Sequence, residues 1–131
     1  MKTLIVEDDF ISRQLLEQYL NQYGPCHTAE NGIDAVDAIK EGLEWDQPYD
    51  LICMDIMMPE LDGQNALREI RAFEESKGIS STRGVKVIMT TALNEIASVK
   101  EAYLSLCDGY LVKPIRKERL FEEIRKLQLI M

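Results

Sequence analysis

The central segment of the sequence is LICMDIMMP, residues 51–59. It begins with four apolar residues, continues with Asp55, and closes in a turn at Pro59. A short apolar run bounded by turn signals is typical of a strand that is buried on both faces. Asp55 then lies at the carboxyl end of the strand, the edge at which open α/β sheets bind ligands. Taken alone, Asp55 could equally be a turn former or a helix cap.

Outward from this stretch, short apolar runs alternate with segments of helical periodicity. Strands are predicted over residues 3–6, 26–30, 51–54, 85–89 and 109–112. Helices are predicted over residues 10–23, 32–43, 62–73 and 94–106, followed by a last helix that contains residues 120–127. This alternation indicates an α/β fold, a doubly wound five-stranded parallel sheet of flavodoxin-like type with five helices and right-handed crossovers. We expect the strand order 2-1-3-4-5 and one domain over residues 1–131.

The composition excludes several classes of protein. A net charge of −8 argues against a direct nucleic-acid binder or a membrane-surface binder, since both need basic patches. The apolar runs are too short to span a bilayer, and the acids at residues 7–9 come too early for a signal peptide. Three cysteines with no Cys-x-x-Cys pair are typical of reduced core residues. We therefore expect a cytoplasmic protein.

The predicted strand ends carry chemically active side chains. Glu7 and Asp8 follow the first strand, and Asp55 follows the third. Thr90 and Thr91 follow the fourth strand, and Lys113 follows the fifth. All carboxyl ends lie at one edge of a parallel sheet, so the three carboxylates would converge if the first and third strands are neighbours. Crowded carboxylates repel one another unless a cation holds them, and Mg²⁺ prefers oxygen ligands. Asp55 would be a competent nucleophile for phosphorus, with Lys113 and Thr91 placed to contact phosphoryl oxygens.

Each of these residues also has an ordinary structural explanation. The acids at residues 7–9 could be a charge cluster favoured by a helix dipole, and Asp9 is expected to cap the helix. Lys113 could be a solvated charge, Thr91 a strand former, and Tyr110 a half-buried strand aromatic. The occurrence of the whole set at four strand ends is what favours a functional site.

The chain resembles the response-regulator receiver domains of two-component signalling, the CheY-like family. The resemblance spans essentially the whole chain, and its motifs are Glu7-Asp8, MDIMMPELDG (residues 54–63), MTTA (residues 89–92) and DGYLVKP (residues 108–114). It implies that Asp55 is the phosphoacceptor. It also implies that Mg²⁺ is bound by Asp8 directly, by Glu7 mostly through water, by Asp55, and by the backbone carbonyl of Met57.

The resemblance assigns further roles near the carboxyl terminus. Thr91 would be the switch hydroxyl, Tyr110 the switch aromatic and Lys113 the phosphate-binding lysine, with a cis peptide between Lys113 and Pro114. The protein would not be an enzyme beyond catalysing its own phosphorylation and slow dephosphorylation. Met57 and Leu93 lie two positions after Asp55 and Thr91, where their side chains should flank the path of a water that attacks the phosphoryl group. Both side chains are bulky and apolar, so we expect slower self-dephosphorylation than in members with polar side chains there.

The implied partners are a sensor histidine kinase or a histidine phosphotransfer protein as donor, and an unknown downstream protein target. Phosphorylation would change the surface of the fourth helix, fifth strand and fifth helix. No effector domain follows Met131, so we expect output by protein–protein contact unless the chain was cut from a longer one. The long connections at residues 42–50 and 74–84 resemble those of receivers in hybrid histidine kinases.

Three other classes of protein share parts of this pattern. A flavodoxin-like flavin binder needs a hydroxyl- and glycine-rich loop after the first strand, where this chain has acids. A Mg²⁺-dependent phosphatase needs a second acid shortly after Asp55, where the chain has Ile56 and Met57. A receiver-like adaptor that acts without phosphorylation is the alternative that sequence does not exclude.

Overall fold

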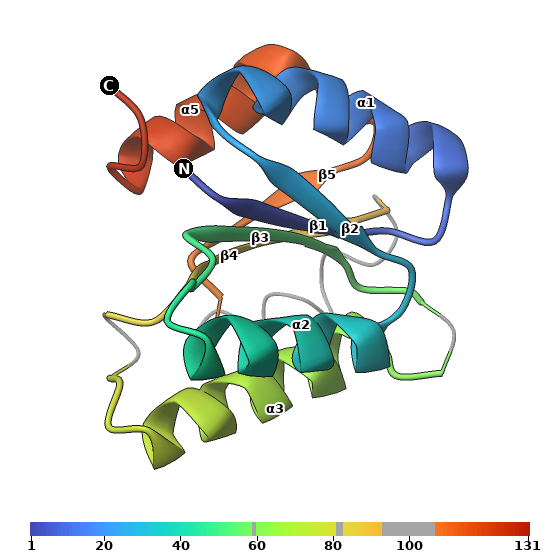
Figure 1. Ribbon diagram of the computed structural model, residues 1–131. Helices are drawn as coiled ribbons and strands as arrows, with labels where there is room; N and C mark the ends of the chain where they lie inside the picture. Colours follow the sequence, from blue (N-terminus) through green and yellow to red (C-terminus); the bar gives the residue numbers. More distant parts are fainter. Residues whose placement is uncertain (59, 81–82, 93–106) are drawn as a thin grey trace.

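Five strands form the sheet in the computed structural model, which describes residues 1–58, 60–80, 83–92 and 107–131. The strands are β1 (Thr3–Val6), β2 (Cys26–Ala29), β3 (Leu51–Asp55), β4 (Lys86–Thr91) and β5 (Gly109–Val112). All neighbours are parallel, in the order β2-β1-β3-β4-β5 (Figure 1). The predicted topology and strand order are confirmed.

Four α-helices and one 3₁₀ helix accompany the strands in the described part of the chain. They are α1 (Phe10–Leu20), the 3₁₀ helix η1 (Asn21–Tyr23), α2 (Gly32–Glu44), α3 (Gly63–Ser76) and α5 (Lys117–Lys126). The helix that was predicted over residues 94–106 lies outside the described residues. Within those residues, no helix combines the length and the apolar character that crossing a membrane requires.

Some predicted boundaries were wrong. The helix predicted over residues 10–23 is α-helical only to Leu20, because its last turn tightens into η1 before the sharp bend at Gly24. β3 includes Asp55, and β4 extends to Thr91 where the sequence predicted an end at residue 89. Both extensions follow from strand pairing, since Asp55 lies opposite Thr90 and Thr91 lies opposite Val112.

Helices cover both faces of the sheet, α1 and α5 on one face and α2 and α3 on the other (Figure 1). Alternate residues of β1 point to opposite faces, so Leu4 and Val6 join the core under α2 and α3, whereas Ile5 joins the core under α1 and α5. Every residue of β3 is buried. This burial on both faces explains why the central strand reads as a continuous apolar run.

Helices α1, α2 and α3 begin at side-chain caps that the sequence supplies. Asp9 accepts a hydrogen bond from the Ser12 N–H (3.0 Å), Asn31 from the Asp34 N–H (2.8 Å), and Asp62 from the Asn65 N–H (2.8 Å). Each cap satisfies a helix N–H group that has no partner within the helix. The expectation that Asp9 caps the first helix is confirmed.

Candidate functional site

The carboxyl ends of β1 and β3 bring three acids together. Val6 is paired with Met54, so the residues that follow, Glu7 and Asp55, leave neighbouring strands at the same edge. Carboxylate oxygens of Glu7, Asp8 and Asp55 all lie within 4.8 Å of one another. Gly63 lies against this edge, where an added Cβ would come 2.5 Å from the Asp55 carbonyl oxygen. The start of α3 can therefore approach Asp55 only because residue 63 has no side chain.

Lys113 joins the acids from the end of β5. Its Nζ donates hydrogen bonds to Glu7 Oε1 (2.8 Å) and to Asp55 Oδ2 (2.9 Å). Its backbone N–H donates to the Thr91 carbonyl (2.8 Å), which fixes the lysine beside the end of β4. The Lys113–Pro114 peptide is cis, as expected. Burial disfavours the charged ammonium, but the bonds to Glu7 and Asp55 outweigh it and raise the pKa of Lys113.

Glu7 carries the least compensated charge in this group. The residue is 1% exposed, and its Oε2 is one of two buried side-chain N or O atoms in the described residues that have no hydrogen-bond partner. Burial, together with the nearby Asp55 carboxylate, raises the pKa of Glu7 from 4.5 to about 7. A buried acid oxygen without a donor fits a cation ligand, because a hard divalent ion would satisfy it and favour the ionised form.

Asp55 is held by two donors. The residue is 6% exposed; Oδ1 accepts the Met57 N–H (3.2 Å) and Oδ2 accepts Lys113 Nζ. These bonds orient the carboxylate at the strand end, beside Glu7 and Asp8. The backbone of Met57 thus lies next to the acids, whereas its side chain is exposed.

Asp8 and Asp9 differ although they are adjacent. Asp8 is exposed and belongs to the acid group. Asp9 turns to the helix, and its hydrogen bonds with the Ser12 hydroxyl and N–H hold the pKa of Asp9 below its ordinary value. Asp8 is therefore the exposed acid available for a ligand at this edge, and Asp9 is occupied by capping.

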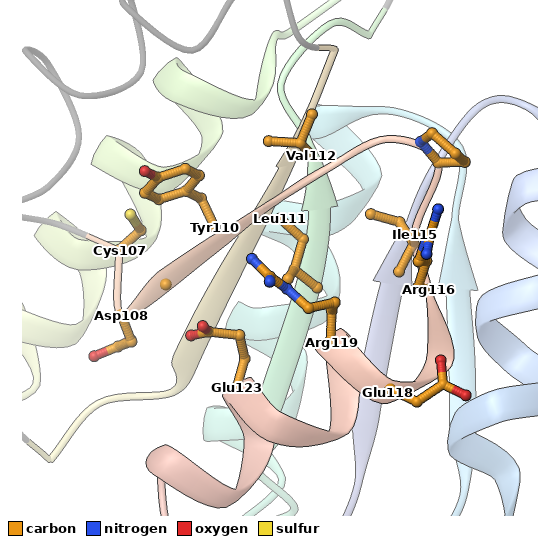
Figure 2. Close-up of a pocket in the computed structure, with 12 residues that line it drawn as sticks. Cys107, Asp108, Tyr110, Leu111, Val112, Ile115, Arg116, Glu118, Arg119 and Glu123 are labelled. Carbon is orange, nitrogen blue, oxygen red and sulfur yellow. The ribbon is translucent and has the colours of Figure 1, made fainter.

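Thr91 lies at the end of β4, and Tyr110 lies within β5, paired with Met89. Thr91 is fully buried, and its hydroxyl donates to the Ala92 carbonyl (3.2 Å). Tyr110 is half-buried and packs against the core under α2 and α3. Figure 2 shows Tyr110 on the side of Cys107, whereas Leu111 points toward α5. The two residues that the sequence singled out as switches thus lie on adjacent strands.

A pocket of about 1010 Å³ lies between β5 and α5 (Figure 2). Arg119 and Glu123 of α5 face it, opposite β5 and the two residues that precede it, Cys107 and Asp108. None of the three acids lines this pocket, so the pocket and the clustered carboxylates are separate features. The pocket lies on the strand and helix that the sequence assigned to the output surface; the fourth helix of that surface lies outside the described residues.

Sequence reasoning missed one residue that contacts the acids. Arg13 of α1 donates from Nη1 to the carbonyl oxygen of Glu7 (2.9 Å), and its Nη2 lies 3.5 Å from Glu30 Oε1. Only its spacing of four residues from Asp9 could have placed it on the first turn of the helix. Nothing in the sequence pattern indicated a contact with the backbone of β1.

A second charge cluster, which we call the Arg71 cluster (Arg71, Glu74, Lys86 and Asp108), was also missed. Arg71 donates to Glu74 Oε1 (2.8 Å), to the Val85 carbonyl (2.8 Å) and to Asp108 Oδ2 (3.1 Å). The charged sequence of residues 74–84 is typical of a helix end followed by an exposed loop, but Glu74 at its start is 2% exposed. Its Oε2 accepts the Val85 N–H (2.7 Å), so the acid is buried because it holds the start of β4.

Comparison with known proteins identifies the family. The family model of the response regulator receiver domain matches residues 3–125. The chain is 34% identical over 124 residues to the chemotaxis protein CheY of Halobacterium salinarum, covering 94% of this chain and 92% of that protein. It is 36% identical over 132 residues to hybrid signal transduction histidine kinase B of Dictyostelium discoideum, covering 95% of this chain but 6% of that protein.

Solved structures agree. The receiver domain of Ssk1 of Saccharomyces cerevisiae, solved with the histidine phosphotransfer protein Ypd1, has a TM-score of 0.84 and 34% identity, covering 100% of this chain and 92% of that one. The receiver domain of sensor histidine kinase PA1611 of Pseudomonas aeruginosa has a TM-score of 0.77 and 31% identity, covering 97% of each chain. That structure has a magnesium ion coordinated in its active-site cleft. The present chain belongs to the response regulator receiver domain family of two-component signalling.

Proposed function

We propose that residues 1–131 act as one receiver unit that accepts a phosphoryl group on Asp55 from a phosphohistidine, in a Mg²⁺-dependent step. The observation that carries the proposal is the shared contact of Lys113 Nζ with Glu7 and Asp55, beside a buried Glu7 oxygen that has no hydrogen-bond partner among the described residues. In the same part of the chain, Lys113 is the one cation bonded to the group of three carboxylates. The group therefore has spare negative charge and free oxygen ligands for a divalent ion.

Each residue has a distinct part in the proposed step. Glu7, Asp8, Asp55 and the Met57 carbonyl would hold the ion, which when bound neutralises charge on the phosphoryl oxygens. An Asp55 oxygen attacks phosphorus, a new O–P bond forms, and the N–P bond to the donor histidine breaks with its electron pair leaving on the imidazole. Lys113 is already within hydrogen-bond distance of Asp55, so it can follow the new negative charge without a large movement.

Signal output would follow from the added charge. The phosphoryl group would draw the Thr91 hydroxyl toward it, and Tyr110 would turn toward the space that this vacates. The surface of the fourth helix, β5 and α5 would then change its affinity for a downstream protein, as a shift between two populated states. The register supports this coupling, since Thr91 and Tyr110 lie on paired strands and Lys113 is bonded to the Thr91 backbone.

The donor is proposed to be a protein, a histidine kinase or a histidine phosphotransfer protein. The apolar side chains at the start of α1 support this proposal, since Phe10 is 58% and Ile11 is 75% exposed directly after the acids. Exposed apolar side chains beside a site are typical of protein contact. The solved complex of a similar receiver with Ypd1 gives the kind of partner.

The first test is intact-protein mass after incubation with acetyl phosphate and Mg²⁺, beside an Asp55→Ala control. A gain of one phosphoryl group that requires Mg²⁺ and is absent from the control is expected. No gain with any divalent ion, in a protein that remains folded, would contradict the proposal. That result would favour the alternative, an adaptor that acts by protein contact without phosphorylation.

A further inference from the structure

Arg13 links three segments around the acid pair. Its side chain is 14% exposed although it lies on a surface helix, because the guanidinium turns inward toward the end of β1. Nη1 donates to the Glu7 carbonyl, Nη2 lies 3.5 Å from Glu30 Oε1 after β2, and the guanidinium carbon lies 5.6 Å from the centre of the Phe10 ring. Arg13 therefore connects α1, the end of β1 and the loop that precedes α2.

The Glu7 carbonyl is the point at which β1 ends and the acid pair begins. Strand pairing of β1 stops at Val6. The Glu7 N–H still donates to the Ala29 carbonyl (3.0 Å), and the Glu7 carbonyl accepts from Arg13. The peptide between Glu7 and Asp8 is thus held by a donor from outside the sheet. Rotation of that peptide would move both carboxylates, because it joins the two residues directly.

Arg13 differs from Lys113 in how it contacts Glu7. Lys113 occupies a carboxylate oxygen of Glu7, which a bound cation would have to share or displace. Arg13 instead contacts the backbone carbonyl of Glu7, which leaves the carboxylate oxygens to other partners. Arg13 can therefore keep its bond whether or not the carboxylates hold an ion.

We propose that Arg13 is a positioning residue for the divalent cation, acting by fixing the Glu7–Asp8 peptide through the Glu7 carbonyl. The inference rests on the proposed function of the acids as the Mg²⁺ site. Partners that orient metal ligands without touching the metal typically change metal affinity by about 10- to 100-fold when they are removed. The contribution of Glu30 is smaller, because that side chain is 71% exposed and the ion pair is long.

The test uses Arg13→Met, which keeps the length of the stem but removes the donors, and Arg13→Lys, which restores one donor. Gln14→Met is the matched control, since it is the neighbouring polar-to-apolar change on the exposed side of α1. Mg²⁺ dissociation constants come from calorimetric titration, with thermal unfolding of the Mg²⁺-free proteins to verify folding. The ¹³C′ chemical shift of Glu7 in the Mg²⁺-free protein reports the carbonyl hydrogen bond directly.

We expect Arg13→Met to weaken Mg²⁺ binding by about tenfold or more and to shift the Glu7 ¹³C′ signal. Arg13→Lys should recover part of the Mg²⁺ affinity and part of the parent ¹³C′ shift. Gln14→Met and Glu30→Gln should stay close to the parent. An unchanged dissociation constant in folded Arg13→Met would overturn the role of Arg13 while leaving the proposed function intact. An equal loss in Glu30→Gln would also overturn it, since the ion pair would then be the cause. Absence of Mg²⁺ binding in the parent would instead overturn the Mg²⁺ site on which the inference depends.

Discussion

Two charge clusters lie at opposite ends of the parallel strands: the three acids at the carboxyl ends and the Arg71 cluster at the amino ends of β4 and β5. The two clusters differ in how their charges are compensated. In the Arg71 cluster, two cations face two acids, because Arg71 contacts Glu74 and Asp108 and Lys86 Nζ lies 4.0 Å from Asp108. At the acid edge, Lys113 pairs with Glu7 and Asp55, and the third carboxylate, Asp8, has an oxygen within 4.8 Å of both acids. The formal sum is zero in the first cluster and −2 in the second.

The hydrogen bonds differ in the same way. Both oxygens of Glu74 accept short bonds, one from Arg71 and one from the Val85 N–H, and Asp108 accepts the Val87 N–H (2.8 Å). Glu7 is buried to a similar degree, but its Oε2 has no hydrogen-bond partner in the part of the chain that the structure describes. The first cluster uses its charges to hold α3, β4 and β5 together. The second keeps an uncompensated charge at the edge where a cation is proposed to bind.

The largest effect on stability is expected from Arg71→Met. This change leaves Glu74 buried without its cation, and breaking a buried pair in this way costs about 3–5 kcal/mol. Urea unfolding at pH 7 measures the difference. A loss below about 1 kcal/mol, the range of a surface ion pair, would show that the cluster does not hold the fold.

Replacing a buried glutamate by glutamine should change the free energy of unfolding in opposite directions in the two clusters. Glu74→Gln presents one oxygen and one NH₂ group to two donors, so one donor loses its acceptor and unfolding becomes easier by about 1–3 kcal/mol. Glu7→Gln removes a buried charge, and its amide can still accept from Lys113. We expect the Mg²⁺-free protein to gain about 1 kcal/mol at pH 8, since each unit of raised pKa corresponds to ~1.4 kcal/mol and the weaker Lys113 bond offsets part. Equal destabilisation by both substitutions would contradict the claim that the buried charge is compensated in the Arg71 cluster and uncompensated at Glu7.

The pH dependence follows from the raised pKa of Glu7. Between pH 4.5 and about 7 the unfolded chain has released the proton that the folded chain still holds. The contribution of Glu7 to the free energy of unfolding is therefore full below pH 4.5 and is lost as the pH rises to about 7. Thermal unfolding of the Mg²⁺-free parent from pH 4.5 to 8, compared with Glu7→Gln, should show a steeper fall for the parent. If stability fell equally with pH in the parent and in Glu7→Gln, the result would contradict a raised pKa of Glu7.

Mg²⁺ binding should respond to pH in the opposite direction. The ionised carboxylate is the ligand, so affinity should rise from pH 6 to 8 and level off above the pKa of Glu7, about 7. Titrations at these pH values provide the measurement. A constant affinity would show that Glu7 does not take part.

The smallest effect on stability is expected from Met57→Asn. The Met57 side chain is 61% exposed, so its replacement should leave the free energy of unfolding within about 0.5 kcal/mol of the parent. Its backbone adjoins Asp55, and a polar side chain there could orient an attacking water. We expect a shorter phosphoryl lifetime on Asp55 in the variant, followed by intact mass over time. An equal or longer lifetime would count against the expectation of slow self-dephosphorylation.

The sequence predicted the sheet and the acid edge because both follow local rules. Continuous apolar runs mark strands buried on both faces, and the residues after them reach one edge in any parallel sheet. The ends of strands were less predictable. Thr90 and Thr91 looked like residues beyond a strand, but pairing with Asp55 and Val112 extends β4 through both.

Contacts between distant charged residues were not predictable. Glu74 and Asp108 lie 3 and 37 positions from Arg71 along the chain. A charged stretch of sequence ordinarily indicates a solvated surface, so the pattern gave no sign that these residues meet in a buried cluster. Only the folded chain shows that Glu74 is buried by its bonds to Arg71 and Val85. Arg13 was missed for the same reason, because its acceptor is a backbone carbonyl, which no sequence pattern marks.

The most direct test of the central claim is a calorimetric Mg²⁺ titration at pH 8 of the parent, Glu7→Gln and Glu74→Gln. Each variant lacks one carboxylate of the parent, and the two substituted acids are buried to a similar degree. We predict one bound Mg²⁺ per chain in the parent, at least tenfold weaker binding in Glu7→Gln, and binding like that of the parent in folded Glu74→Gln. Equal binding by all three proteins would contradict the claim that the uncompensated acids at the carboxyl edge form the cation site.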